Sequence, residues 1–537
     1  MKFDSIPITE RSNPKSINID VLGVEDIIKV LSDCEAEIFG GYEGYTGIYQ
    51  KTLVQKYLLF ASGIHQEIKN KGKVNLILIG SGTSGRLCRL MAKILNPIVG
   101  AKININPIIA GGIKALVRAE PNTEDKTEKG VADYLSYTTN LDRSNCFVIG
   151  VTCGLSANYV KGALDEANKY SKEKTSIIGF NPLELATIEL SKDIQVFNPI
   201  IGPEAIVGSV RMKGGTATMV LIYALLVSSV KPTRQIESEL NNIFINCQDT
   251  LSCICSYQAI ITNMICSGNQ TLQAGGSIYL LGTSSYGALC IYDAAECPPT
   301  FGAKIQQVNG YSDQGVTDLV YFPGEGVANM AKEIDFGIFI KNTLPHLNKK
   351  DMVVAISNSG NVSKNMSALT NDTKLKLFYS IEITPNGVKS KINDKDIVFE
   401  KKWSDNFQKI LFIRSLLVYI STGSFVLSGK VYENKMIDLH ITNKKLFLRA
   451  IRIINNITNK DEAIIKEVLL RNIYEGEVPS NNLLEDHISL SATKENMVPL
   501  TILSLVYPEA SIEKLRIMLK NEPIVRKLVI KEMVNLK

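Results

Sequence analysis

Two short polar loops in the first half of the chain combine residue types that bind anions. The apolar run Val74–Ile79 leads into GSGTSGRL (Gly80–Leu87), and the run Cys146–Val151 leads into TCGLS (Thr152–Ser156). Glycines expose backbone N–H groups, hydroxyls add donors, and a helix that starts in the loop adds partial positive charge. One such loop is as readily a mere tight turn. Two of them at the carboxyl ends of neighbouring parallel strands converge on one crevice, so together they predict a phosphate site. The residues expected to face the ligand are Gly82, Thr83, Ser84, Thr152, Cys153, Gly154 and Ser156.

The first loop has a second, altered copy. GTSSYGAL (Gly282–Leu289) repeats GSGTSGRL at an offset of 202 residues, and the register continues without a gap into the following segment. A register held over this length favours a duplicated domain. The second copy runs into DAAECPPTFG (Asp293–Gly302), and its Glu296 aligns with Ile94 of the first copy. We therefore expect a single site assembled from two unequal halves.

Glu296 admits two functional roles. Against a sugar, a carboxylate accepts hydrogen bonds from hydroxyls, or it transfers protons if burial raises its pKa. A helix cap or an ion pair with a lysine is the alternative, which the ECPPTFG context disfavours. The crevice of the second copy should be inactive, because Ser285 and Tyr286 replace Thr83 and Ser84, and a tyrosine fills space that a phosphate needs. Serines of the later segment SNSGNVS are relics or a weak anion site: Ser357, Ser359 and Ser363.

Composition excludes several classes of protein. The chain has 537 residues, and its net charge of +5, from 59 basic and 54 acidic side chains, is too dilute for a nucleic-acid or membrane-surface protein. The longest apolar run that we found, Met219–Val230, is short of the roughly 20 residues that span a bilayer. The polar N-terminus predicts a protein of the cytosol. Four separated histidines, no CxxC pair and ten scattered cysteines predict reduced thiols, no metal and no other cofactor.

The order of apolar runs predicts an α/β fold with two tandem doubly wound parallel-sheet domains and a third, all-helical domain. Short β-branched runs alternate with helical stretches, the pattern restarts near Ser277, and from Gly429 the apolar residues keep helical spacing. The expected strands are Val74–Ile79, Ile103–Ile109, Cys146–Val151, Ser176–Phe180, Ile194–Val196, Ser277–Leu281, Met352–Ile356 and Lys376–Ser380, and a long helix is expected at Phe407–Leu427. The expected parts are an N-terminal helical segment (1–45), the two sheet domains (46–235 and 236–428) and the helical domain (429–537).

Three further segments carry a resemblance to known families. IIAGGIKALVRAEPNTED (Ile108–Asp125) and GPEAIVGSVRMKGGTA (Gly202–Ala217) resemble the sugar isomerase (SIS) domain of bacterial N-acetylmuramic acid 6-phosphate etherases, and TERSNPKSINID (Thr9–Asp20) resembles their opening. The two-copy layout and the segment Ser421–Ala450 resemble the glucokinase regulatory protein family. The resemblance covers nearly the whole chain and implies two SIS domains with a helical lid.

The resemblance also assigns roles to single residues. The two glutamates that are catalytic in the etherases match Glu124, in a GAED-like motif, and Glu296, in the ECPPT motif. In the regulatory family the lid reaches the sugar phosphate, and the matching positions are Lys445 and Arg449. These two residues lie four positions apart on an expected helix, so their side chains share one face. Such a pair of basic residues usually belongs to a solvent-exposed face. The GPEA segment departs from the etherase pattern at Val207, Val210 and Met219, which casts doubt on catalysis.

Two functions follow from the resemblance. The first is a regulator that binds fructose 6-phosphate or fructose 1-phosphate between the SIS domains and controls a glucokinase or hexokinase. The second is an etherase that releases lactate from N-acetylmuramic acid 6-phosphate with Glu124 and Glu296 as its acid/base pair. An aldose–ketose isomerase fits the motifs less well. The internal pseudo-dimer is compatible with a monomer, and a regulator of a eukaryotic cell would also suit the nucleus.

Overall fold

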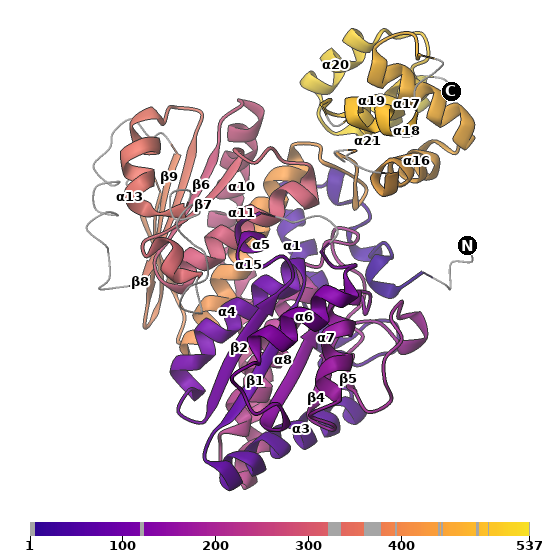
Figure 1. Cartoon of the computed structure of the whole chain (residues 1–537). Helices are drawn as coiled ribbons and strands as arrows, with labels where there is room; N and C mark the ends of the chain where they lie inside the picture. Colours follow the sequence, from indigo (N-terminus) through magenta and orange to yellow (C-terminus); the bar gives the residue numbers. More distant parts are fainter. Residues whose placement is uncertain are drawn as a thin grey trace.

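A five-stranded parallel sheet forms the centre of the first half of the chain (Figure 1). The computed structural model describes residues 6–118, 123–319, 334–358, 377–392, 395–438, 441, 444–479, 483–491 and 493–535. The strands of the first sheet are β1 (Val74–Gly80), β2 (Ile103–Ile109), β3 (Cys146–Val151), β4 (Thr175–Ile178) and β5 (Gln195–Phe197). Their order is β2-β1-β3-β4-β5. The chain order therefore reverses between β1 and β3, where the crevice of a doubly wound sheet opens.

Helices cover both faces of this sheet because its strands are apolar on both sides. Leu76 and Leu78 of β1 join one hydrophobic core, whereas Ile77 and Ile79 join another core that includes Tyr159. The helices of this half are α1 (Val24–Glu35), α2 (Glu37–Gly40), α3 (Lys51–Lys71), α4 (Gly82–Val99), α5 (Lys114–Val117), α6 (Thr127–Tyr137), α7 (Asn158–Asn168) and α8 (Lys213–Ser229). Helices α3, α4 and α8 pack together on one side of the sheet, and α6 packs on α7 at the other.

The second half contains a six-stranded sheet of order β11-β10-β9-β8-β6-β7. Its strands are β6 (Ile278–Gly282), β7 (Val308–Ser312), β8 (Met352–Asn358), β9 (Leu377–Thr384), β10 (Gly387–Ile392) and β11 (Lys395–Glu400). Strands β6 to β9 are parallel, as the repeat predicts, and β10 and β11 add an antiparallel edge. This edge was not predicted; a two-residue loop, Pro385-Asn386, joins Thr384 of β9 to Gly387 of β10.

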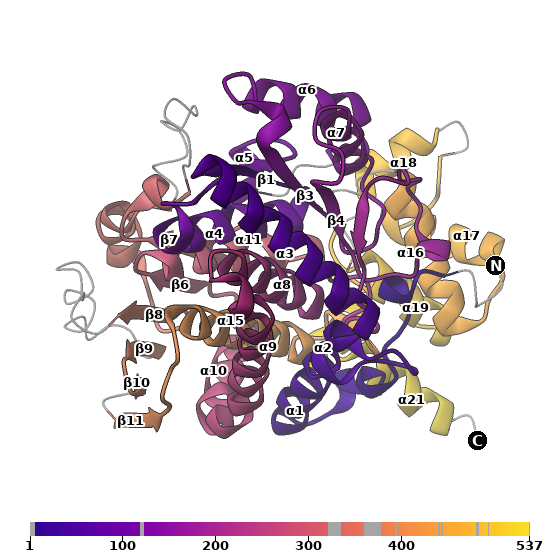
Figure 2. The ribbon, with the colours of Figure 1, turned by 90° about the horizontal axis from the view of Figure 1, so that it is seen from below.

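A layer of helices separates the two sheets, as Figure 2 shows for α4, α8, α11 and α15. The helices of the second half are α9 (Ile236–Ser252), α10 (Gln258–Gln273), α11 (Ser285–Phe301), α13 (Phe336–Ile338) and α15 (Asn406–Leu427). Helix α15 is long and apolar enough to cross a membrane by length and composition alone, but 94% of its apolar window is buried inside the protein. It is thus the central core helix, and its apolar run is longer than the one that the sequence analysis found.

The C-terminal part is helical, as predicted, and has a hydrophobic core of its own. A small hairpin, β12 (Val431–Tyr432) and β13 (Lys435–Met436), leads into it. The helices are α16 (Lys444–Thr458), α17 (Glu462–Tyr474), α18 (Leu484–Ser491), α19 (Met497–Val506), α20 (Ile512–Asn521) and α21 (Val525–Asn535). The apolar α19 lies at the centre and packs against α16, α17, α20 and α21. In Figure 1 this unit stands to one side of both sheets.

Candidate functional site

The two polar loops of the first half leave the sheet side by side. Strands β1 and β3 are neighbours, and Gly80 lies opposite Val151 at their carboxyl ends. The loops touch, because Ser84 Oγ lies 3.8 Å from Cys153 Sγ. Helix α4 starts at Gly82 and α7 at Asn158, so two helix N-termini lie next to the crevice. Free backbone N–H groups and helix dipoles of this kind favour an anion.

The first loop is a tight turn from strand to helix. A Cβ added to Gly80 would lie 2.6 Å from the backbone nitrogen of Gly85, so the turn has room for glycine alone. Gly82 is exposed and has a φ of +52°, a conformation that glycine adopts without strain. Thr83 is half-buried and Ser84 is buried. The first loop is therefore a compact turn with Gly82 at the surface, and its binding of an anion stays a prediction.

In the second loop the hydroxyls have different places. Thr152 is buried, and its Oγ1 accepts hydrogen bonds from the backbone N–H groups of Ser156 (3.2 Å) and Ala157 (3.3 Å). Ser156 is exposed at the surface of the loop. Burial raises the pKa of the Cys153 thiol to about 12, so this cysteine stays protonated at neutral pH. The hydrogen bonds of the buried Thr152 thus stabilise the loop, and Ser156 lies at the surface, where a ligand can reach it.

Glu296 reaches across from the second half of the chain to the first loop. It lies near the C-terminal end of α11, and its Oε1 accepts hydrogen bonds from Thr83 Oγ1 (2.7 Å) and Arg86 Nη1 (2.5 Å). Among the described residues, no hydrogen bond or ion pair reaches the other oxygen, Oε2, and the side chain keeps 11% of its surface exposed. One oxygen thus fixes the carboxylate, and the second is available to accept a hydrogen bond from a hydroxyl.

Arg86 is a site residue that the sequence analysis missed. Its Nε donates to the carbonyl oxygen of Leu116 at 3.1 Å, and its Nη1 holds Glu296. Thr83 and Arg86 are three residues apart on α4, a spacing that puts both on one face of a helix. The sequence GSGTSGRL already shows this spacing. It does not show the partner of Arg86, because Glu296 lies 210 residues away in the chain.

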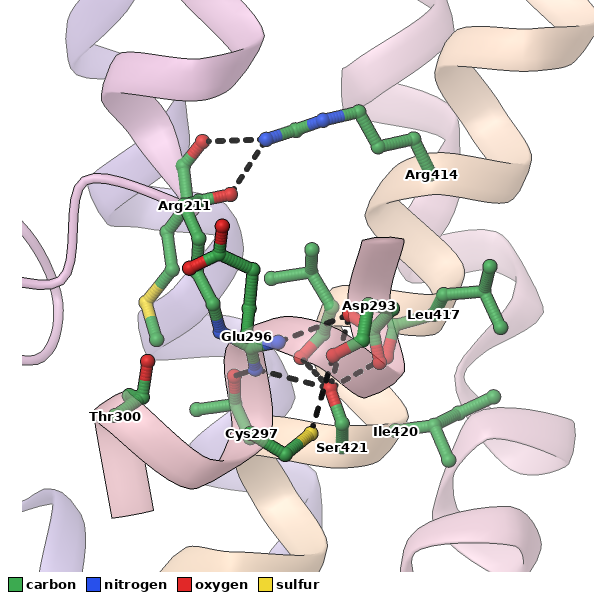
Figure 3. Close-up of polar contacts among 12 residues, drawn as sticks. Arg211, Asp293, Glu296, Cys297, Thr300, Arg414, Leu417, Ile420 and Ser421 are labelled. Atoms are coloured by element: carbon green, nitrogen blue, oxygen red, sulfur yellow. Dashed lines mark hydrogen bonds and ion pairs between the residues drawn. The ribbon is translucent and has the colours of Figure 1, made fainter. Parts of the chain in front are cut away.

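A small pocket of about 40 Å³ lies between the two halves beside Glu296, lined by Thr83, Arg86, Leu87, Arg211, Leu289, Tyr292, Asp293, Glu296, Arg414, Leu417 and Val418. Figure 3 shows the polar contacts beside it. Arg211 Nη1 donates to Asp293 Oδ1 at 2.9 Å, and Arg211 Nη2 donates to the hydroxyl of Ser421 at 2.9 Å. Burial raises the pKa of the Asp293 carboxyl, and Arg211 opposes this shift. These contacts join a segment of the first SIS-like half to α11 and α15 of the second.

Arg414 of α15 reinforces the same junction. Its guanidinium donates to the carbonyl oxygens of Arg211 (2.5 Å) and Met212 (3.2 Å) and to Thr216 Oγ1 (2.5 Å), as the dashed lines in Figure 3 partly show. The side chain is buried, and this burial lowers the pKa of the guanidinium. The two halves are therefore joined by buried charges that lie beside the crevice.

Glu204 lies under the second loop, where it caps α8. Its carboxylate accepts hydrogen bonds from the backbone N–H groups of Lys213 (2.9 Å) and Gly214 (2.8 Å), the first residues of that helix. A Cβ added to Gly214 would lie 3.4 Å from Cys153 Sγ, so Glu204 and the loop are close. Burial raises the pKa of Glu204 to about 7, against the opposing charge of Lys213. Glu204 thus lies next to Cys153 of the second loop.

The pH dependence of the free energy of unfolding should reveal the raised pKa of Glu204. Between the unfolded pKa near 4.5 and the folded pKa near 7, the folded protein holds a proton that the unfolded chain has released. The resulting stability is fully present below pH 4.5 and is lost as the pH rises through 7, by roughly 3 kcal/mol. In Glu204→Gln this part of the pH slope should vanish, whereas the exposed Glu184→Gln should keep it. Urea unfolding from pH 5 to pH 8 measures the slope, and equal slopes in both variants would contradict the assignment.

Two residues assigned by resemblance, Glu124 and Arg449, make no hydrogen bond or ion pair with this cluster in the part of the chain that the structure describes. The Glu124 side chain is exposed, and its carbonyl oxygen accepts a hydrogen bond from the N–H of Tyr159 on α7 at 2.9 Å. Lys445 lies in the first turn of α16, but its side chain lies outside the described residues. Arg449 faces Glu10, and a Cβ on Gly208 would lie 3.0 Å from Glu10 Oε2 and 3.8 Å from Arg449 Nη2. Arg449 thus contacts the rim of the first domain.

The equivalent loop of the second half differs as the sequence indicates. Tyr286 takes the place of Ser84 and is 2% exposed, so its ring fills the core. Ser357 is buried at the end of β8, and Ser359 and Ser363 lie outside the described residues. In the part of the chain that the structure describes, no group of three His, Cys, Asp or Glu side chains comes together to hold a metal ion.

Comparison with known proteins places these features in a family. The model of the glucokinase regulatory protein N-terminal SIS domain matches residues 60–168, the model of its second SIS domain matches 255–377, and the model of its C-terminal lid domain matches 433–529. Glucokinase regulatory proteins of Xenopus laevis and Homo sapiens are 27% and 28% identical to the chain, over 94% of it and 89% of their own length.

The bacterial relatives align with part of the chain. The N-acetylmuramic acid 6-phosphate etherase of Petrotoga mobilis (strain DSM 10674 / SJ95) is 35% identical over 225 residues, which are 42% of this chain and 70% of the etherase. Two SIS domains and a lid, arranged in this order along nearly the full length of the relatives, show that the chain belongs to the glucokinase regulatory protein family and is related to these bacterial etherases.

Proposed function

We propose that the chain is a regulatory protein that binds a phosphorylated sugar between its SIS domains and thereby controls a glucokinase or hexokinase. The observation that carries the proposal is the contact of Glu296 with Thr83 and Arg86. It places a carboxylate from one half beside the anion loops of the other. A phosphate and a set of hydroxyls need this combination of groups at one site.

The ligand would lie with its phosphate on the two loops. The N-termini of α4 and α7, the exposed hydroxyl of Ser156 and the backbone of Gly82 and Gly154 supply donors and partial positive charge. The free oxygen of Glu296 then accepts hydrogen bonds from sugar hydroxyls. Fructose 6-phosphate and fructose 1-phosphate are the ligands that we propose, with Lys445 closing over them from the lid.

The regulatory role rests on the relatives and on the architecture. Proteins named as regulators of glucokinase share this chain's two SIS domains and lid over almost their whole length. The two copies of the SIS domain are unequal, with one crevice keeping the hydroxyl loop and the other filled by Tyr286. One ligand per chain, a lid and a partner kinase in the cytosol or nucleus make up the proposed function.

Ligand-dependent stability tests the sensor. Fructose 6-phosphate, fructose 1-phosphate and sorbitol 6-phosphate are each titrated into the full chain, and the melting temperature is recorded. A ligand that binds only the folded state stabilises it by about 2.7 kcal/mol at a concentration of 100 Kd. We expect at least one of the three to raise the melting temperature and then to change the inhibition of a purified glucokinase by the protein. No shift with any of them would contradict the proposal.

The etherase is the second candidate, because Glu296 and the ECPPT motif are present and a bacterial etherase is 35% identical over 225 residues. It requires two carboxyl groups at the reacting carbons. Glu296 lies in the crevice, but the Glu124 side chain is exposed and has no recorded contact with it. We therefore expect no lactate from N-acetylmuramic acid 6-phosphate above the level of a Glu296→Gln control. Lactate release that Glu296→Gln abolishes would make the chain an etherase.

A further inference from the structure

The N-terminal segment 8–21, here called the strap, is mostly polar, and four of its polar side chains are buried. It consists of three short turns, η2 (Ile8–Glu10), η3 (Pro14–Ser16) and η4 (Ile19–Val21). Thr9, Asn13, Ser16 and Asp20 are each at most 4% exposed. Buried polar groups are normally hydrogen-bonded, so the partners of these four side chains show which parts of the protein the strap is bonded to.

The N-terminal end of the strap is hydrogen-bonded, through Asn181, to the second loop, Thr152–Ser156. Asn181 is fully buried, and its Nδ2 donates both to the carbonyl oxygen of Gly154 (2.9 Å) and to Thr9 Oγ1 (3.0 Å). The backbone N–H of Thr9 donates in return to Asn181 Oδ1 at 3.1 Å. A Cβ on Gly154 would lie 3.8 Å from Thr9 Oγ1. Thr9 and Asn181 thus fix the backbone on which the proposed phosphate site is built.

The middle of the strap joins the GPEA segment to the hairpin that leads into the lid. Asn13 Nδ2 donates to the carbonyl oxygen of Pro203 at 2.8 Å, and Ser16 Oγ donates to that of Ala205 at 2.8 Å. Asn434, between β12 and β13, donates to Asn13 O and Ser16 Oγ, both at 3.0 Å. It also accepts from the N–H of Val207 at 2.9 Å. One buried network therefore spans three parts of the sequence.

The far end of the strap is bonded to the lid itself. Asp20 is 1% exposed, and its carboxylate accepts from Arg526 Nη1 of α21 at 3.1 Å and from the N–H of Glu433 at 2.7 Å. Arg526 also donates to the carbonyl oxygen of Ile17 (3.1 Å) and to Asn18 Oδ1 (3.0 Å). The strap is thus bonded to the last helix of the lid and to the hairpin that precedes its first helix.

We propose that the strap couples the second anion loop to the lid, with Thr9 and Asn181 as positioning residues of the loop. The regulatory meaning of this coupling rests on the proposed function, because the ligand would act on the lid through the loop. The physical reason is that the Thr9–Asn181 pair at one end and the Asp20 carboxylate at the other are buried, so that neither can shift without losing its hydrogen bonds or moving the strap. Coupling of this kind is reciprocal, so a change that destabilises the bonds at the lid must also change the stability of the loop.

Hydrogen exchange of the full chain without ligand gives the first test. Arg526→Gln removes the ion pair between the strap and the lid. Thr9→Val removes the hydroxyl that accepts the hydrogen bond from Asn181 beside the loop. The matched control is Arg516→Gln, since Arg516 pairs with Glu475 inside the lid and makes no hydrogen bond or ion pair with the described residues of the strap. We expect Arg526→Gln to speed exchange of the loop amides of Leu155, Ser156 and Ala157 roughly fivefold. Thr9→Val should speed exchange at Glu433 and in α21 by a similar factor, and Thr9→Ser, which keeps the hydroxyl, should not.

A second arm adds fructose 6-phosphate at saturation. In the wild type we expect slower exchange in α16 and α21, and in Thr9→Val we expect the ligand to bind while this lid protection is lost. If fructose 6-phosphate does not bind the wild type, the proposed function fails, and the arm without ligand still decides the coupling. Loop exchange that is unchanged in Arg526→Gln would overturn the coupling. So would an equal effect of Arg516→Gln, which would trace the change to a general loosening of the lid.

Discussion

Replacement of Asp293 by leucine should lower the free energy of unfolding by about 3–5 kcal/mol, the cost of leaving one member of a buried ion pair without its partner. Arg211, at 3% exposure, would keep two hydroxyl partners, Ser421 and Thr422, but no opposite charge. Urea unfolding followed by the fluorescence of Trp403, the single tryptophan of the chain, measures the change.

The double variant and an exposed pair give the controls. Arg211→Met with Asp293→Leu should recover much of the lost stability, because neither charge then remains buried. Glu467→Leu removes the same kind of charge from the exposed pair with Arg471 on α17 and should cost no more than about 1 kcal/mol. If Asp293→Leu were as mild as Glu467→Leu, the hydroxyls of α15 alone would satisfy Arg211.

Replacement of Thr83 by valine should weaken the binding of fructose 6-phosphate by about 10- to 100-fold. The hydroxyl lies at the start of α4, where it contacts Glu296, and a hydrogen bond to a charged partner contributes about 1.5–3 kcal/mol. The shape of the side chain is retained, so the turn between β1 and α4 should stay intact. Isothermal titration calorimetry with the full chain measures the affinity.

Ser285→Ala is the matched control, because Ser285 occupies the position of Thr83 in the second copy. Tyr286 fills the core beside it, so we expect the affinity of Ser285→Ala to stay within about twofold of the wild type. Equal losses in the two variants would mean that both crevices bind the ligand. An unchanged affinity in Thr83→Val would mean that the bond between Thr83 and Glu296 does not contribute to ligand binding.

The division of the site between two unequal SIS domains has a structural consequence. Thr83 and Arg86 lie at the start of α4, Glu296 lies near the end of α11, and the two helices pack against each other. Any rotation of one domain against the other would move the carboxylate away from the loops. The buried contacts of Arg211 and Arg414 keep the two halves in register. Stability of the domain junction and affinity for the ligand should therefore change together.

Much of the fold was predictable because local patterns dominate there. The apolar runs at Ile103–Ile109 and Cys146–Val151 became strands with those bounds, since strands that are buried on both faces read as continuous apolar segments. The antiparallel edge of β10 and β11 was not predicted, because its sequence is mixed polar and half-exposed. The expected domain boundaries, after residues 45, 235 and 428, stay predictions.

The sequence by itself determined the elements and the chemistry of the anion loops. Glycine spacing, hydroxyls and the asymmetry of the repeat follow from residues close together in the chain, and they singled out Thr83, Ser156 and Glu296. Tertiary structure alone decided which charges meet: Arg86 with Glu296, Arg211 with Asp293 and Arg526 with Asp20, the last pair 506 residues apart. It also left the Glu124 side chain exposed, away from any recorded contact with Glu296. The reason is physical: a charge is buried only beside a partner, and partners are brought together by the packing of whole domains.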